Sequence, residues 1–303
     1  MGPLLFNIFI NDFFMFIEQS LVCNFADDMS LYACGATIDM VVLKLEHDMN
    51  NALTWFDNNS LVPNPDKFQF MILGTRSKPY LCLEINDKKI ISNTKITLLG
   101  ILIDWKLQFN EHVKSLCIKA NNKVSAMMRL RNLLSTEQKL VLFNSFVSSQ
   151  FGYCPLIWMF HGKSANDIID RVHRRALRAV YNDFQSDYDS LLAMGNHQRI
   201  HQLNLKKLIL KIYKCLNNEA PCILSGIFTA KNNCVHDLRI NNLLQLPAKC
   251  STRTYGLHSF KYRGSATWNT LSDNFKKCEK SSILKNLLKT ASINCSCKMC
   301  IVT

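Results

Sequence analysis

Residues 21–32 read LVCNFADDMSLY and place two adjacent carboxylates, Asp27 and Asp28, between two short apolar runs. Apolar alternation around a small residue and two Asp residues predicts a strand, a tight turn and a returning strand. Carboxylates at a hairpin tip offer the oxygen ligands that Mg²⁺ prefers, and two such ions could hold a transferring phosphoryl group. A solvated turn is the alternative, because Asp is common in turns for reasons unrelated to metals. On the pair alone, the solvated turn is the better interpretation.

The sequence before this tract changes that interpretation. Residues 2–12 read GPLLFNIFIND, and the FADD motif follows at residues 25–28. The arrangement closely resembles the reverse transcriptase of LINE-type (non-LTR) retrotransposons, in which a helix with the first motif precedes a Phe-Ala-Asp-Asp hairpin in the polymerase palm. Further matching segments are residues 64–71, 98–113, 172–178 and 259–271. The resemblance therefore covers nearly the whole chain, and its first block is the most specific part.

The resemblance implies RNA-directed DNA polymerase activity, in which nucleotides are added to a primer 3′ hydroxyl. It implies Mg²⁺ as the cofactor, and an RNA template and a DNA primer as partners. By match to the family motif, Asp27 would contact the metal directly and Asp28 would support it. Lys67 would assist the departing pyrophosphate, although a surface lysine beside Asp66 is at least as good an interpretation.

The resemblance also assigns a primer-gripping role to one short segment. Leu99, Gly100 and Ile101 match the family's positions beside the primer end, and an ordinary core strand is the alternative. No endonuclease signature is found in the chain, so target nicking is not expected of it.

One half of the family's active site has no counterpart in this sequence. In the family, a strand upstream of the Gly-Pro-Leu-Leu-Phe helix carries another metal-binding aspartate, and the fingers precede that strand. A two-ion site needs carboxylates that hold ions about 3.5–4 Å apart, and neighbouring strand residues such as Asp27 and Asp28 face opposite ways. We therefore expect a truncated polymerase that is inactive alone. A noncatalytic basic nucleic-acid-binding protein derived from such an element is the alternative.

We predict an α+β fold, with a partial reverse-transcriptase palm sheet and helices followed by a mostly α-helical thumb and C-terminal region. The expected zones are a partial palm over 1–75, a small β unit over 76–109, a helical basic region over 110–217, and a tail of uncertain fold over 218–303. Apolar runs predict strands over 67–73, 80–85, 89–91 and 98–103, with a turn at residues 86–87.

A long helix is predicted after the hairpin by three- and four-residue apolar spacing. Its core stripe consists of Ile38, Val41, Val42, Leu45, Met49, Ala52, Leu53 and Phe56. The polar residues Asp39, Glu46, Asp48 and Asn50 are predicted to face away from that core.

Helical periodicity also dominates from residue 110 to about 217, with helices predicted over 114–133, 136–150, 166–182 and 197–216. The third helix carries four arginines at i, i+3, i+4 and i+7, which places them on one face suited to a phosphate backbone. They are Arg171, Arg174, Arg175 and Arg178. Asp167 and Asp170 stand four residues before the first two of these, so pairing within the helix is the alternative. Ile169, Val172, Ala176 and Val180 are predicted to pack inward.

Composition favours a globular protein with an affinity for nucleic acid. The chain has 303 residues, 48% of them apolar, and a net charge of +13. Residues 1–110 carry a net charge of −4 and residues 111–303 carry +17. A basic second part could neutralise phosphates, although a basic protein can also result from generic solubility. Arg253, Lys261 and Arg263 interleave with aromatic residues in the tail, which would suit either base stacking or simple packing.

Thirteen scattered cysteines indicate free thiols in a reducing compartment, and so an intracellular protein of the nucleus or cytoplasm. Cys295, Cys297 and Cys300 cluster, but a closed zinc site needs four ligands and no His lies between them and Cys278. Metal binding by this cluster is therefore not the preferred interpretation. Residues 300–303 have the outline of a prenylation box, but Thr is not among its usual final residues, so a frayed tail is preferred to that signal. His197 and His201 lie one helical turn apart and are predicted to be surface residues. The apolar stretch from Gly2 ends at Asn11, so no membrane span is expected.

Overall fold

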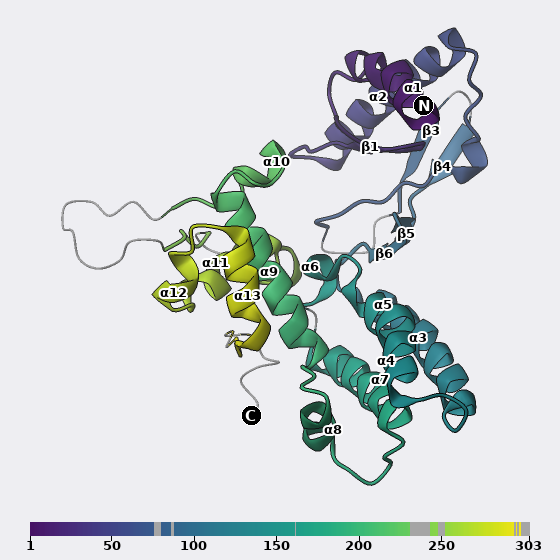
Figure 1. Cartoon of the computed structure of the whole chain (residues 1–303). Helices are drawn as coiled ribbons and strands as arrows, with labels where there is room; N and C mark the ends of the chain where they lie inside the picture. Colours follow the sequence, from purple (N-terminus) through teal and green to yellow (C-terminus); the bar gives the residue numbers. More distant parts are fainter. Residues whose placement is uncertain are drawn as a thin grey trace, which may run out of the picture. The chain divides into compact units, whose positions relative to one another are not determined.

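The structure, a computed structural model, describes residues 1–75, 80–85, 88–160, 162–230, 243–247, 252–293, 295 and 297. The chain divides into two compact units, unit 1 (Met1–Trp105) and unit 2 (Lys106–Thr303) (Figure 1). Helices and short antiparallel hairpins make up the described residues, which confirms the predicted α+β class. The finer division into four zones stays a prediction.

Unit 1 combines helices with three separate two-stranded hairpins among its described residues. Its elements are α1 (Gly2–Phe9), the 3₁₀ helix η1 (Ile10–Phe16), β1 (Leu21–Phe25), β2 (Asp28–Tyr32), α2 (Ile38–Asn58), the 3₁₀ turn η2 (Pro65–Lys67), β3 (Cys82–Ile85), β4 (Lys88–Ile91), β5 (Lys95–Leu98) and β6 (Ile101–Asp104). The turn predicted at residues 86–87 lies outside the described residues.

The predicted strand, turn and returning strand around the Asp pair are confirmed. β1 and β2 pair antiparallel, with Leu21 opposite Tyr32 and Phe25 opposite Asp28. This register leaves Ala26 and Asp27 as a two-residue turn, in which Ala26 has a φ of 54°. A two-residue loop closes the hairpin tightly, and Asp27 and Asp28 therefore lie at its tip.

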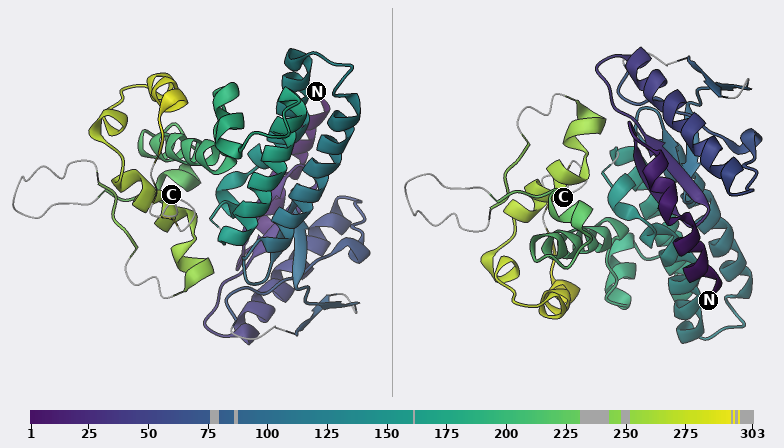
Figure 2. Two further views of the ribbon diagram at one scale, coloured as in Figure 1. Left: turned by 90° about the horizontal axis from the view of Figure 1, so that it is seen from below. Right: turned by 90° about the horizontal axis from the view of Figure 1, so that it is seen from above.

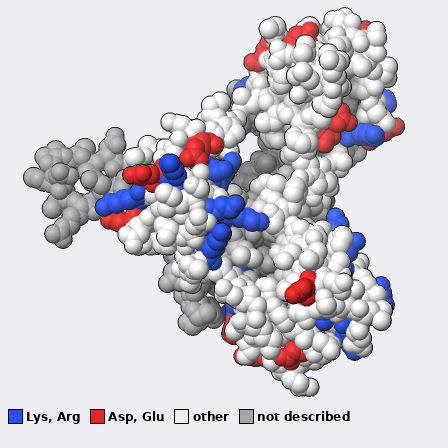
Figure 3. Space-filling model, viewed as in Figure 1, with Lys and Arg blue, Asp and Glu red and all other residues white. Residues whose placement is uncertain are grey.

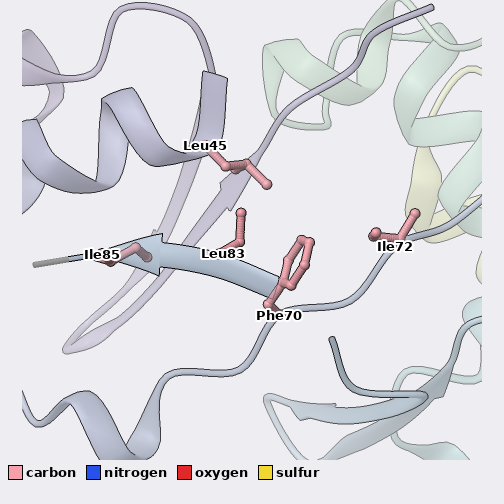
Figure 4. Close-up of a cluster of buried hydrophobic side chains, with 5 residues drawn as sticks. All are labelled: Leu45, Phe70, Ile72, Leu83 and Ile85. Carbon is pink, nitrogen blue, oxygen red and sulfur yellow. The ribbon is translucent and has the colours of Figure 1, made fainter. Parts of the chain in front are cut away.

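Helix α2 organises two small cores in unit 1. Leu45 packs with Phe70, Ile72, Leu83 and Ile85, as Figure 4 shows. Farther along the same helix, a second cluster forms from Ala52 and Trp55 with Ile10 and Phe13. The predicted apolar stripe is thus confirmed in its central part, whereas Ile38 at the helix start is exposed.

The strand predicted over 67–73 is wrong. Residues 65–67 form the turn η2, and residues 68–73 form no ladder with described residues. Phe70 and Ile72 are nevertheless buried, and the N–H of Asn93 donates to the carbonyl oxygen of Phe70 at 2.6 Å. Alternate burial gave the segment the pattern of a strand, but a strand also requires a paired neighbour.

The single strand predicted over 98–103 is also wrong, because the chain reverses inside it. β5 and β6 pair antiparallel, with Leu98 opposite Ile101. Leu99 and Gly100 form the turn with φ values of 47° and 78°. Positive φ at both central residues is the backbone of a type I′ hairpin turn. Leucine rarely adopts such a φ, which hid the turn from the sequence pattern.

Unit 2 is helical in all its longer described elements. They are α3 (Asn110–Leu130), α4 (Thr136–Leu142), the π-helical turn η3 (Phe143–Ser148), α5 (Ser149–Gly152), α6 (Pro155–Trp158), α7 (Lys163–Tyr181), α8 (Tyr188–Met194), α9 (Ile200–Leu216), α10 (Cys222–Ser225), the π-helical turn η4 (Arg253–Leu257), α11 (Phe260–Asn269), α12 (Asp273–Lys276) and α13 (Ser281–Thr290).

Two packed helix groups form unit 2. Helix α3 lies against α7, and α9 packs against α11 and α13 (Figure 2). The four predicted helices correspond to α3, the run from α4 to α5, α7 and α9, although η3 interrupts the second. The predicted inward residues of α7, Ile169, Val172, Ala176 and Val180, are all buried.

No helix among the described residues is long and apolar enough to cross a membrane.

Candidate functional site

Asp27 and Asp28 present their carboxylates to solvent at the tip of the β1–β2 hairpin. Both residues are exposed. Neither side chain forms a hydrogen bond or an ion pair with any residue that the structure describes. A carboxylate in this state keeps its oxygen atoms available for a hard cation.

The chain before the hairpin is anchored by a different carboxylate, that of Asp48 in α2. Asp48 is fully buried. Its oxygens accept hydrogen bonds from the backbone N–H groups of Glu18 at 3.1 Å and Gln19 at 3.1 Å. The sequence predicted that Asp48 faces away from the core, and that prediction is wrong. Its partners lie about 30 residues away in the sequence, so helical spacing alone could not reveal them.

The hydrogen bonds decide the charge of Asp48. Burial by itself raises the pKa of this carboxyl, but the donors of residues 18–20 and of His47 outweigh burial and lower the pKa below its ordinary value of 3.8. Asp48 therefore stays ionised and fixes the start of β1. A second structural carboxylate is that of Asp12, which accepts a hydrogen bond of 3.0 Å from the indole Nε1 of the fully buried Trp55.

Several large apolar side chains of unit 1 are exposed. Helix α1 buries no residue, and Leu4, Leu5 and Ile8 are 65%, 60% and 65% exposed. In β1, Leu21 is 73% exposed. Exposed apolar side chains that gather in one patch usually mark an interaction site.

The other family-matched positions of unit 1 lie at the surface, at a turn and, for Ile101, in a buried strand position. Lys67 ends η2 and is exposed. Its neighbour Asp66 forms an exposed ion pair with Lys88 at 3.9 Å. Leu99 and Gly100 form the tip of the β5–β6 hairpin, and Ile101 is the buried first residue of β6. The structure does not gather these positions into one described pocket with Asp27.

The four arginines of α7 differ in their surroundings. Arg171 is exposed, and its Nε donates to the backbone carbonyl of Asp167 at 3.3 Å. Arg174 is half-buried and makes no hydrogen bond or ion pair with the described residues. Arg175 binds the side chains of Asn121 and Ser125 on α3, and Arg178 donates to the carbonyl of Ser186 at 3.3 Å.

These contacts divide the predicted basic face. Arg175 holds α7 to α3, and Arg178 holds α7 to the loop before α8. The guanidinium groups of Arg171 and Arg174 form no ion pair with the described residues and can contact an outside partner. The alternative pairing of Asp170 with Arg174 is wrong, because Asp170 pairs with Arg199 at 3.5 Å and accepts a hydrogen bond from Tyr188 at 3.4 Å.

The histidines of unit 2 are buried more deeply than the sequence indicated. His201 is 6% exposed, and His197 is half-buried with its Nε2 2.7 Å from the hydroxyl of Tyr181. The prediction that both are surface residues is therefore wrong. His173, which the sequence did not single out, is 1% exposed and lies 2.7 Å from the Tyr188 hydroxyl. Burial and then the nearby His197 lower the pKa of His173 to about 3.

The charges of the two units have opposite sign. From the sequence, unit 1 carries a net charge of −5 and unit 2 carries +18. Figure 3 shows Lys and Arg side chains over the helices of unit 2, including the region of α9 and α13. In the tail, Arg263 lies over the ring of Phe160 at 5.8 Å and Trp268 is buried, so these two residues pack within unit 2.

Known proteins that are similar to this chain are reverse transcriptases. The family described as reverse transcriptase (RNA-dependent DNA polymerase) matches residues 1–103. The chain is 23% identical over 190 residues to the "RNA-directed DNA polymerase from mobile element jockey" of Drosophila melanogaster, a match that covers 59% of this chain and 21% of that protein. It is 22% identical over 192 residues to the "Probable RNA-directed DNA polymerase from transposon BS" of the same organism, with the same shares covered.

The chain thus spans about a fifth of the length of these curated relatives. No solved structure matches it. The family match includes both the GPLLF helix α1 and the FADD hairpin, which are the two most specific motifs of the sequence. Residues 1–103 are therefore similar to the reverse transcriptase family, and the curated relatives of the chain are RNA-directed DNA polymerases of a mobile element and a transposon.

Proposed function

We propose that unit 1 supplies one carboxylate-bearing hairpin to the palm of an RNA-directed DNA polymerase, and that unit 2 binds the backbone of the nucleic acid. The exposed and unpaired state of Asp27 and Asp28, inside the segment that matches the reverse transcriptase family, carries this proposal. Asp48 and Asp12 in the same unit have internal partners. Asp27 and Asp28 thus differ from these structural carboxylates in having no described partner.

The donor set is suited to Mg²⁺, which prefers carboxylate oxygens. In this proposal Asp27 binds the ion directly and Asp28 supports it. Bound Mg²⁺ supplies charge neutralisation at the reacting phosphates. Lys67 is exposed and free to approach an anionic leaving group, and Leu99, Gly100 and Ile101 would approach the primer. The partners are an RNA template and a DNA primer.

The proposed activity needs more polypeptide than this chain contains. Adjacent residues on a hairpin face opposite ways, so a second strand must bring the opposing carboxylate. The exposed apolar face of α1 supports the same conclusion, because Leu4, Leu5 and Ile8 would be covered by the rest of a palm. We therefore propose that this chain is a truncated part of the enzyme and is inactive alone.

An RNA-templated primer-extension assay with Mg²⁺ tests this proposal. The chain alone should give no extension. Addition of a family segment that carries the fingers and the upstream aspartate strand should restore extension. Extension by the chain alone, or the lack of any extension after the segment is shown to bind, would contradict the proposal.

A second candidate is a noncatalytic nucleic-acid-binding protein, which the net charge of +18 on unit 2 favours. Binding through phosphates weakens steeply with salt, because each phosphate contact releases counterions. Arg171→Ala and Arg174→Ala should each reduce the salt slope by about 1, whereas Arg175→Ala should chiefly destabilise the α3–α7 contact. Salt-sensitive binding that persists without extension in the presence of the added segment would favour this second candidate.

A further inference from the structure

Three buried donor atoms meet at one point of unit 2, although they come from distant parts of the sequence. His201 lies in the first turn of α9, and Cys295 and Cys297 follow α13. The Nε2 of His201 lies 3.6 Å from the Sγ of Cys295 and 3.3 Å from the Sγ of Cys297. The exposed fractions of the three residues are 6%, 6% and 2%. A soft, buried and compact donor set of this kind is what a thiophilic metal requires.

Two of the three distances between the donor atoms agree with a tetrahedral zinc site. With Zn–S near 2.3 Å and Zn–N near 2.05 Å, tetrahedral angles place S and N about 3.6 Å apart and two S atoms about 3.8 Å apart. The two sulfur–nitrogen separations lie within a few tenths of an ångström of this value. The two Sγ atoms are 2.7 Å apart, and neither cysteine is part of a disulfide. Zinc binding would therefore require the two Sγ atoms to separate by about 1 Å.

The backbone next to the cysteines is already fixed to α9. The side chain of Gln202 donates to the carbonyl of Ile293 at 3.0 Å and accepts from its N–H at 3.1 Å. The Nζ of Lys206 donates to the carbonyl of Lys289 at 2.8 Å. These contacts come from the residues that flank His201 on its helix. They bring the C-terminal segment to the imidazole without help from a metal, so the ligands are positioned in advance.

Packing also restrains the imidazole of His201. Its ring meets the edge of Phe160 with 6.4 Å between the centroids, and Ile293, two residues before Cys295, is 2% exposed. A packed apolar shell limits access of water to the three donor atoms. Cys300, the further cysteine of the cluster in the sequence, lies outside the described residues.

We propose that His201, Cys295 and Cys297 supply three protein ligands to a Zn²⁺ that joins the C-terminal segment to α9. Zinc bound there connects residues more than 90 positions apart in the chain. The metal would therefore stabilise the folded state of unit 2 by closing a long loop. Neither the Asp27 hairpin nor nucleic-acid binding is needed for this site.

Metal analysis of the full chain, purified under reducing conditions from zinc-supplemented cells, tests the proposal. The wild-type chain should contain about one zinc ion per molecule. His201→Gln, Cys295→Ser and Cys297→Ser should each weaken zinc affinity at least tenfold. Cys222→Ser, an exposed cysteine of the same unit, and His197→Gln, on the other side of the Arg199 cap, should leave the zinc content unchanged.

A second readout separates metal loss from misfolding. Co²⁺ added to the chelated wild-type chain should give a thiolate-to-cobalt charge-transfer band, and each Cys→Ser variant should weaken that band. Chelation of the wild-type chain should also make the segment after α13 more sensitive to protease. The proposal is overturned if the wild-type chain binds neither Zn²⁺ nor Co²⁺, if the His201→Gln variant keeps full zinc affinity, or if Cys295 and Cys297 form a disulfide in the reduced preparation.

Discussion

Units 1 and 2 place their apolar and charged groups in opposite ways. Unit 1 is acidic, presents Asp27 and Asp28 to solvent, and leaves the apolar residues of α1 exposed. Unit 2 is basic and buries long apolar stripes on α7 and α9 together with His173 and His201. The exposure of α1 supports the proposal that further polypeptide covers this helix of unit 1.

The largest effect is expected from a cavity in the core of unit 2. Leu208 on α9 is fully buried, so Leu208→Ala should lower the free energy of unfolding of unit 2 by about 2–5 kcal/mol. Hydrogen exchange measured by mass spectrometry should show faster exchange in α9, α11 and α13 and no change in unit 1. Equal acceleration in both units would contradict the division of the chain into two cores.

A pH effect is expected from His173 in unit 2. The pKa of this buried residue is lowered from 6.5 to about 3, so the unfolded chain takes up a proton before the folded chain does. The contribution of His173 to stability is complete above about pH 6.5 and is lost as the pH falls toward 3, at up to about 1.4 kcal/mol per pH unit. Urea unfolding at a series of pH values measures this slope. His173→Gln should remove it, and an unchanged slope would contradict the assignment.

In unit 1 the corresponding buried titratable residue is Asp48, which is ionised whereas His173 is neutral. Asp48→Asn replaces an acceptor with a donor opposite the N–H of Glu18 or Gln19, and should lower the free energy of unfolding of unit 1 by about 2 kcal/mol. Because the pKa of Asp48 is lowered from 3.8, its contribution is present above that pH and is lost as the pH falls through the lower folded value. The exposed Asp57 on the same helix is the matched control, and Asp57→Asn should change stability by less than about 0.5 kcal/mol.

The smallest effect on stability is expected on α1. Leu5 is 60% exposed, so Leu5→Ser should change the free energy of unfolding by less than about 0.5 kcal/mol. The same substitution should reduce binding of a hydrophobic dye and self-association of the chain, because it removes exposed apolar surface. A large loss of stability would show instead that α1 is part of the core of unit 1.

Features that depend on neighbours in the sequence could be predicted. The β1–β2 hairpin follows from its apolar alternation and its two-residue turn, and the inward face of α7 follows from helical spacing. Features that depend on distant partners could not. Asp48 is buried because its hydrogen bonds reach residues about 30 positions away, and His201 meets Cys295 across 94 positions.

Some predictions about the candidate site were also incomplete or wrong, and the structure shows why. The turn at Leu99 was hidden because leucine seldom adopts a positive φ. The four arginines of α7 do share a helix face, but the sequence could not show that α3 already holds Arg175. The sequence near Cys295 and Cys297 contains no histidine. The histidine that meets them, His201, lies 94 and 96 positions away.

The role of the hairpin carboxylates is tested most directly by RNA-templated primer extension with the added family segment, comparing Asp27→Asn with Asp57→Asn. Both changes remove one exposed carboxylate from unit 1, so their effects on charge and stability should be similar. We predict that Asp27→Asn lowers the extension rate at least about a hundredfold, because a metal ligand is lost, and that Asp57→Asn leaves the rate unchanged. Equal rates for the two variants would contradict a catalytic role for the hairpin.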